Sequence, residues 1–196
     1  MIWIKKIKNF FRDKSRDNLC KHLRTIGVDV SFAERGIPEE KLFNPWHRRS
    51  LGVININSDY LISYINIIKR DRGKNTPPRW WYYFAIPSKT SKDKKNYIEV
   101  KSKKNKSFFG ICKEKSFEWL SNNNGEYLAK KFTNDSEINS LVSLGNIRVQ
   151  SLHEKFSGYS IELEFIGKAI KNSTLDINHW NALNKIARLF IENRID

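Results

Sequence analysis

The sequence predicts an α+β fold, in which a mostly antiparallel sheet follows a basic amphipathic N-terminal helix and precedes a helical interlude and a C-terminal ββα unit. Three observations support this prediction. Runs of β-branched and aromatic residues separated by polar turns begin at Ser50, and apolar residues recur at helical spacing before and after these runs. The last fifty residues first alternate between apolar and polar positions, as strands do, and then carry one broad apolar stripe at helical spacing. We expect one continuous domain overall, with an N-terminal helix and connector in residues 1–49 and the α+β domain in residues 50–196.

Apolar and basic positions alternate at helical spacing over residues 2–26, and Gly27 is a natural end for this helix. We predict that the helix packs on the protein's own core. The alternative is a helix that lies in an anionic membrane surface, although Asp13 and Asp17 argue against lipid contact beyond its first three turns. In that alternative the membrane-binding residues are Trp3, Lys5, Lys6, Ile7, Phe10 and Phe11.

The sheet is predicted from a series of short apolar runs. Residues 27–49 read as a connector with one short helical turn at Pro38–Leu42, because proline suits the first position of a helix. The run at 60–68 is apolar on both faces, which is typical of a central strand. The expected strands are Leu51–Ile56, Tyr60–Ile68, Arg79–Ile86, Asn96–Lys101 and Ser107–Cys112.

The second half of the chain reads as helices followed by a hairpin and a final helix. Helical spacing predicts helices at Ser116–Leu120, Glu126–Phe132 and Asp135–Leu144. Alternating residues then predict strands at Ile147–His153 and Tyr159–Ile166, joined by a hairpin loop. Asp176 is a suitable N-cap for the closing helix.

The sequence contains none of the spacings that catalysis or metal binding requires. Its four histidines form no HExxH pattern, and no phosphate-binding loop or nucleophile elbow occurs, so we expect no cofactor, no metal and no enzymatic activity. Two isolated cysteines, no long apolar run and no secretory signal fit a soluble cytoplasmic protein. Glu162 and Glu164 share one face of a strand, as carboxylates of two-metal nucleases do. Their alternation favours the simpler interpretation of a solvated strand face.

Positive charge is concentrated in residues 69–106, which hold 13 basic and three acidic residues and therefore +10 of the chain's net +15. The abundance of Lys, Ile and Asn suggests that an AT-rich genome contributes to the basicity. Such a bias does not explain the clustering, since residues 146–196 carry a net charge of only +1. The window also surrounds an aromatic block, Arg79 to Phe84, and Arg48 and Arg49 add cations just before the first strand.

Cations beside aromatic rings suit a polyanion that also stacks, so we predict non-catalytic binding of nucleic acid. The predicted stacking residues are Trp80 and Tyr82, with Trp81 and Tyr83 as the alternative pair on the opposite face of the strand. The predicted phosphate contacts are Lys69, Arg70, Arg72, Lys74, Arg79, Lys94, Lys95, Lys101, Lys103, Lys104 and Lys106. The alternatives are attachment to an anionic membrane through the N-terminal helix and binding of an acidic protein partner. No small-molecule substrate is expected.

Overall fold

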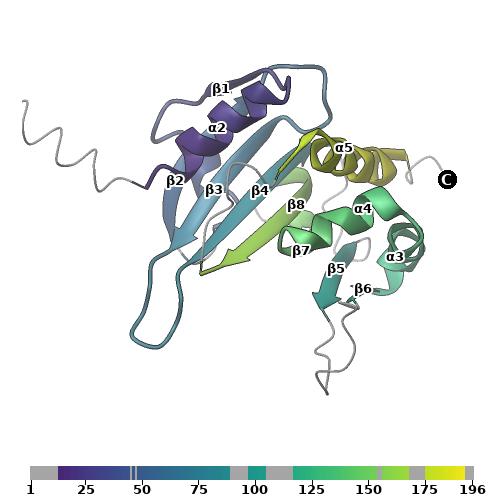
Figure 1. Ribbon diagram of the computed structural model, residues 1–196. Coiled ribbons are helices and arrows are strands. Elements are labelled where there is room, and N and C mark those ends of the chain that lie inside the picture. The colour runs from purple at the N-terminus through teal and green to yellow at the C-terminus, as the bar shows by residue number, and fades with distance from the viewer. Residues whose placement is uncertain are drawn as a thin grey trace, which may run out of the picture.

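The computed structural model describes residues 13–44, 46, 48–88, 97–104, 117–153, 156–167 and 175–192. Over these residues the chain has an α+β fold with an eight-stranded antiparallel sheet (Figure 1). The strands are β1 (Val30–Phe32), β2 (Arg49–Ile56), β3 (Tyr64–Arg70), β4 (Arg79–Pro87), β5 (Glu99–Lys104), β6 (Phe117–Ser121), β7 (Asn146–His153) and β8 (Phe156–Ile166). The α-helices of the described part are α2 (Ser15–Thr25), α3 (Glu126–Thr133), α4 (Ser136–Ser140) and α5 (Ile177–Glu192), and short 3₁₀ turns include Pro38–Lys41.

The strand order is β1-β2-β3-β4-β8-β7-β5-β6, so the late hairpin β7–β8 is inserted between β4 and β5. Strand β4 pairs with β8 along its whole length, from Arg79 opposite Ile166 to Pro87 opposite Gly158. Strand β5 then pairs with β7, and the edge strand β6 pairs with β5. The sequence-local hairpins thus lie at the two sides of the sheet, and the hairpin from the ββα unit joins them.

The α-helices of the described part, α2 to α5, cover the same face of the sheet (Figure 1). The main core lies in between and contains side chains from every helix and from alternate positions of the central strands. On β4 these positions are Trp80, Tyr82, Phe84 and Ile86. The largest buried side chain of α5, Trp180, is fully buried and its ring lies near that of Phe84. The helices therefore seal one face from water, and the other face needs a different cover.

Residues 33–44, which contain the 3₁₀ turn Pro38–Lys41 but no α-helix, cover part of the second face, and we call them the covering segment. Its Phe43 stacks on Tyr83 at 5.2 Å and meets Phe156 edge-on at 5.0 Å. The buried Asn66 on β3 donates hydrogen bonds of 2.8 Å to the carbonyl oxygens of Glu39 and Leu42. Phe43 has a left-handed φ of 60°, which costs a non-glycine residue about 1 kcal/mol. The ring contacts and the Asn66 bonds hold the segment down in spite of that cost.

Most predicted elements are present. The structure confirms the strands near 51–56, 79–86, 147–153 and 159–166, the helices near 126–132 and 135–144, and the closing helix capped by Asp176. It also confirms the short turn at Pro38–Lys41 and the central position of β3. Helix α2 confirms the second half of the predicted N-terminal helix, and Gly27 follows it with a φ of 86°. Residues 2–12 and the predicted strand 107–112 lie outside the described residues.

Three boundaries or assignments differ from the prediction. Residues 116–120 were predicted as helix, but Phe117–Ser121 is strand β6, because pairing with β5 places Trp119 in the core. Strand β1 was not expected, since three residues carry too little periodicity to be recognised. Strand β3 begins at Tyr64 rather than at residue 60, and residues 57–63 form the connection from β2.

The start of helix α2 is fixed to the end of the sheet by an ion-pair network around Asp13. The carboxylate of Asp13 lies 2.8 Å from the ammonium of Lys69 and 4.0 Å from the guanidinium of Arg49. Burial raises the pKa of Asp13, but hydrogen bonds from Lys69 and Ser15 outweigh burial and lower it to about 2. The charged carboxylate therefore stabilises the junction between α2 and β3.

We predict that Asp13→Asn lowers the free energy of unfolding by about 2 kcal/mol at pH 7. Because folding lowers the pKa of Asp13, its contribution is present above the ordinary value of 3.8 and is lost as the pH falls toward 2. Urea denaturation of the wild type and of Asp13→Asn at several pH values from 7 to 3 should show that the difference in their free energies of unfolding becomes smaller as the pH falls. The matched control is Asp71→Asn, whose carboxylate also contacts Lys69 but is 61% exposed. An equal loss in both variants would contradict the prediction.

Candidate functional site: a basic groove on the helix-free face

No α-helix of the described residues lies on the second face of the sheet, which we call the helix-free face. A groove crosses the part of this face that the covering segment leaves open. It consists of two hollows of about 410 and 350 Å³. Arg148, Glu162 and Glu164 line both hollows, which therefore adjoin each other, and we refer to them together as the groove. Each hollow lies within the range of about 300–1,000 Å³ that is typical of ligand pockets.

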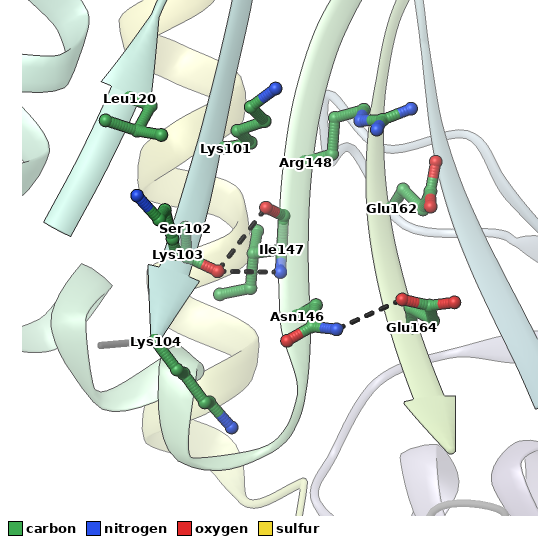
Figure 2. A pocket seen from close by; sticks show the side chains of 10 residues that line it. All are labelled: Lys101, Ser102, Lys103, Lys104, Leu120, Asn146, Ile147, Arg148, Glu162 and Glu164. Carbon is green, nitrogen blue, oxygen red and sulfur yellow. Dashed lines mark hydrogen bonds between the residues drawn. The ribbon is translucent and has the colours of Figure 1, made fainter. Parts of the chain in front are cut away.

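Strand alternation explains which side chains face the groove. On β8, Ile161 and Leu163 point into the helix-covered core, so Glu162 and Glu164 must face the opposite side. On β7, Arg148 lies between the core residues Ile147 and Val149 and faces the groove for the same reason. Figure 2 shows Arg148 and Glu162 projecting from neighbouring strands to the same side. The register confirms that these two residues are direct cross-strand partners.

The lining of the groove is strongly basic. Six basic side chains line it against two carboxylates, Glu162 and Glu164. The basic residues are Arg48, Arg79, Lys101, Lys103, Lys104 and Arg148. A concave surface with this surplus raises the local concentration of anions.

Several of these cations are held in place by carboxylates. Arg79 donates a 2.9 Å hydrogen bond to Glu164, which also accepts one of 3.0 Å from Asn146 (Figure 2). Arg148 and Lys101 lie 3.5 and 3.8 Å from Glu99. Such exposed or half-exposed pairs contribute little to stability. They orient the cations while leaving them accessible to a competing anion.

Arg48 is placed differently from the other cations. Its guanidinium lies over the ring of Trp81, 4.0 Å from the centroid. Asn44 fixes the backbone at this point by a pair of hydrogen bonds with the amide and the carbonyl of Arg48. The guanidinium itself makes no ion pair within the described part of the chain. Stacking on an aromatic face preorganises the planar guanidinium for a bidentate contact with an anion.

The carboxyl group of Glu162, on the floor of the groove, has a raised pKa. Burial raises the pKa of Glu162 to about 7, because desolvation outweighs the attraction of Arg148 and Arg48. The like charges of Glu164 and Glu99 raise it further. Tyr83 on β4 is its cross-strand neighbour on the other side. Glu162 therefore changes its charge close to neutral pH.

The structure brings four of the predicted phosphate-binding residues to the groove, namely Arg79, Lys101, Lys103 and Lys104. Arg70, Arg72 and Lys74 lie at the end of β3 and in the loop after it, and the last two are exposed. Lys69 faces the helix-covered side, where it pairs with Asp13 and lies over the Trp80 ring. The predicted residues outside the described part are Lys94, Lys95, Lys106, Trp3, Lys5, Lys6, Ile7, Phe10 and Phe11.

The proposed stacking role of Trp80 and Tyr82 needs correction. Trp80 is 7% exposed and Tyr82 is fully buried, because both rings pack under the helices. The alternative pair, Trp81 and Tyr83, is 6% and 8% exposed under Arg48 and Phe43. Neither pair has a ring face available for a base. An exposed ring at the groove is Trp46, which is 72% exposed.

Sequence reasoning singled out neither Arg148 nor Trp46 as a binding residue. The alternating residues of Ile147–His153 predicted a strand there, but no local pattern shows that β7 lies beside β5. Trp46 and Arg48 belong to a cationic stretch that was noted before the first strand. Whether a tryptophan there is buried or exposed depends on the path of the covering segment, which the sequence does not encode locally.

Comparisons of the chain with protein-family models, with curated proteins and with solved structures found no match. Among the described residues, no group of three or more His, Cys, Asp and Glu side chains is arranged to hold a metal ion. None of the helices in the described part is long and apolar enough to cross a membrane.

We predict that Glu162→Gln removes a pH dependence of stability. The pKa of Glu162 rises from 4.5 to about 7 on folding, so the folded state holds an extra proton between these values and loses stability as the pH rises through them. The loss amounts to about 3 kcal/mol between pH 4.5 and pH 8. Urea denaturation should therefore show Glu162→Gln more stable than the wild type at pH 8 and nearly equal at pH 4.5.

The control for this measurement is Glu126→Gln, which removes one carboxylate from the exposed surface of helix α3. Its stability should follow the wild type at both pH values. If the difference in stability between the wild type and Glu162→Gln is the same at both pH values, the raised pKa of Glu162 is disproved.

Proposed function

We propose that the protein binds a polyanion, specifically nucleic acid, along the groove of its helix-free face. The observation that carries this proposal is the convergence of cations from four separate segments of the chain. Arg48 follows the covering segment, Arg79 begins β4, the lysines of 101–104 belong to β5, and Arg148 belongs to β7. Phosphate neutralisation by such cations supplies most of the affinity of sequence-tolerant nucleic-acid binding.

Further cations extend the basic surface at one end of the sheet. The register pairs Arg49 with Lys69 and Arg70 with Arg79, so the start of β2 and the β3–β4 loop lie together. The end of β8 lies there as well, since Arg79 is opposite Ile166. Arg72 and Lys74 are exposed in this loop. A nucleic-acid strand that lies in the groove would therefore reach a second set of side chains that can bind phosphate.

The affinity for nucleic acid should fall as the salt concentration rises, and it should also fall when lysines of the groove are removed. We expect the double substitution Lys101→Ala/Lys103→Ala to weaken binding of a single-stranded oligonucleotide, because it removes two phosphate contacts. The plot of log affinity against log salt concentration should become shallower by roughly 1 to 2. Fluorescence anisotropy titrations from about 50 to 200 mM salt measure both effects.

The matched control is Lys21→Ala/Lys130→Ala, which removes two exposed lysines from α2 and α3 on the helix-covered side. It should bind like the wild type. Equal weakening in both double variants would show that only net charge matters, and negligible binding by the wild type at about 50 mM salt would refute the proposal.

Membrane attachment remains a second proposal, favoured by one observation. Asp13 is held at the cationic end of the sheet by Lys69 and Arg49, so the preceding basic segment joins the protein there. Deleting residues 2–12 should abolish sedimentation with anionic phosphatidylserine vesicles if this proposal holds, and should leave nucleic-acid affinity at the groove largely intact. Unchanged sedimentation would exclude it. Binding of an acidic protein stays a prediction that pull-down from native extract can test.

A further inference from the structure

Glu162 is anomalous for a surface that binds phosphates. It lies in a basic groove, yet it forms no ion pair or hydrogen bond among the described residues. The other carboxylates on this face do have partners, since Glu164 binds Arg79, Glu99 lies near Arg148, and Glu118 lies 3.1 Å from Lys103. A carboxylate at this position repels phosphate. Its chemistry instead suits a hydrogen-bond donor brought in by the ligand.

We propose that the groove receives a base of a single-stranded nucleic acid and that Glu162 selects bases bearing an exocyclic amino group. This inference rests on the proposed nucleic-acid binding and adds the substrate preference of the same site. Phosphate contacts position a nucleic acid without reading its sequence, whereas contacts to base edges specify it. Glu162 would be the specifying residue, with the surrounding cations as the positioning ones.

The hydrogen-bond donors and acceptors of the carboxylate and of the bases explain why amino-bearing bases would be selected. An ionised carboxylate only accepts hydrogen bonds. The N4 amino group of cytosine donates to it, as Glu and Asp do accept from cytosine in known complexes. Thymine presents carbonyl oxygens on both sides of its single N–H group, and these oxygens repel the carboxylate. A good base contact of this kind discriminates by roughly tenfold or more.

The neighbourhood of Glu162 supports a base at this position. Arg148 and Gln150 flank it from β7 and line the same hollow, so donors and acceptors lie side by side on the groove floor. Tyr97 donates a 3.4 Å hydrogen bond to Gln150 and a shorter one of 2.8 Å to Glu99. The exposed ring of Trp46 at the edge of the groove offers a face for stacking, which is typical of single-strand binding.

The recessed position of Glu162 favours a single strand over a duplex. A base paired in a duplex has its Watson–Crick edge occupied, and a side chain on the floor of a groove does not reach into the grooves of a double helix. Sequence-selective recognition by sheet surfaces commonly uses unpaired bases that are splayed out. The hollow of about 410 Å³ beside Glu162 is suited to one nucleotide.

The selection should depend on pH, because a protonated carboxyl donates as well as accepts. Glu162 is faced by Tyr83 from β4, by Arg148 from β7, and by Arg48 next to the covering segment, with Glu164 on its own strand and Glu99 on β5. Burial raises the pKa of Glu162 to about 7; Glu164 and Glu99 raise it further, and Arg148 and Arg48 oppose this rise. The preference for amino-bearing bases should therefore be strong at pH 8 and weaker at pH 6.

The test compares two fluorescein-labelled hexanucleotides, oligo(dC) and oligo(dT), by anisotropy at fixed low salt. The two probes have equal charge and similar base size. Their bases differ at position 4 (amino group or carbonyl oxygen), at N3 (acceptor or N–H donor) and in the 5-methyl group of thymine. We expect the wild type to bind oligo(dC) about tenfold more tightly than oligo(dT) at pH 8. The ratio should approach one in Glu162→Gln, largely because oligo(dT) binds more tightly. The control Glu126→Gln, which removes a distant carboxylate, should keep the wild-type ratio.

The possible outcomes distinguish base selection by Glu162 from nucleic-acid binding as such. Tight binding of both probes with equal affinity at pH 8 overturns base selection and leaves nucleic-acid binding standing. A ratio that persists in folded Glu162→Gln, or that is the same at pH 6 and pH 8 in the wild type, also overturns the role of Glu162. The pH series uses the wild type alone, so it decides even if the variant fails to fold. No binding of either probe refutes the proposed function as well.

Discussion

The pairing of β4 with β8 is the interaction on which the rest of the structure depends. It joins the meander β1–β4 to the second half of the sheet, which contains β7, β5 and β6. Its register aligns Tyr82 with Leu163 on one face and Tyr83 with Glu162 on the other. The first pair lies in the core below the helices, and the second lies where the groove crosses the sheet. One hydrogen-bonded ladder thus defines both the core and the candidate site.

One-sided coverage of the sheet follows from this arrangement and has a direct consequence for charge. An antiparallel sheet tolerates one solvated face, whereas the other must be buried. The helices bury one face, and the covering segment shields only the part around Tyr83 and Phe156 on the other. The remaining surface is partly enclosed, so a carboxyl there is desolvated while cations reach it from several strands. Desolvation outweighs the attraction of these cations and raises the pKa of Glu162, which has no hydrogen-bond or ion-pair partner among the described residues.

The net charge of a sequence window does not show which of its cations are accessible to a ligand. Lys69 belongs to the basic window, yet it is committed to Asp13 on the helix side. Arg148 belongs to the nearly neutral C-terminal part, yet it lies in the middle of the groove. A net charge counted along the sequence treats both residues alike. Their difference comes from which face of a strand each occupies and which strand lies next to it.

The sequence by itself determined the fold class, most of the elements and, in the C-terminal hairpin, which residues share a face, because periodicities of 2 and 3.6 are local properties. It also placed Glu162 and Glu164 together on the outer face of their strand, and it located the cations of 101–104. The tertiary structure alone decided that β8 inserts beside β4, that residues 117–121 become an edge strand, and that both aromatic pairs of β4 are buried. These outcomes depend on contacts between segments that are distant in the sequence; Arg79 and Glu164, for example, are 85 residues apart. Local sequence patterns do not encode such contacts, and the groove forms only where they bring several separate segments together.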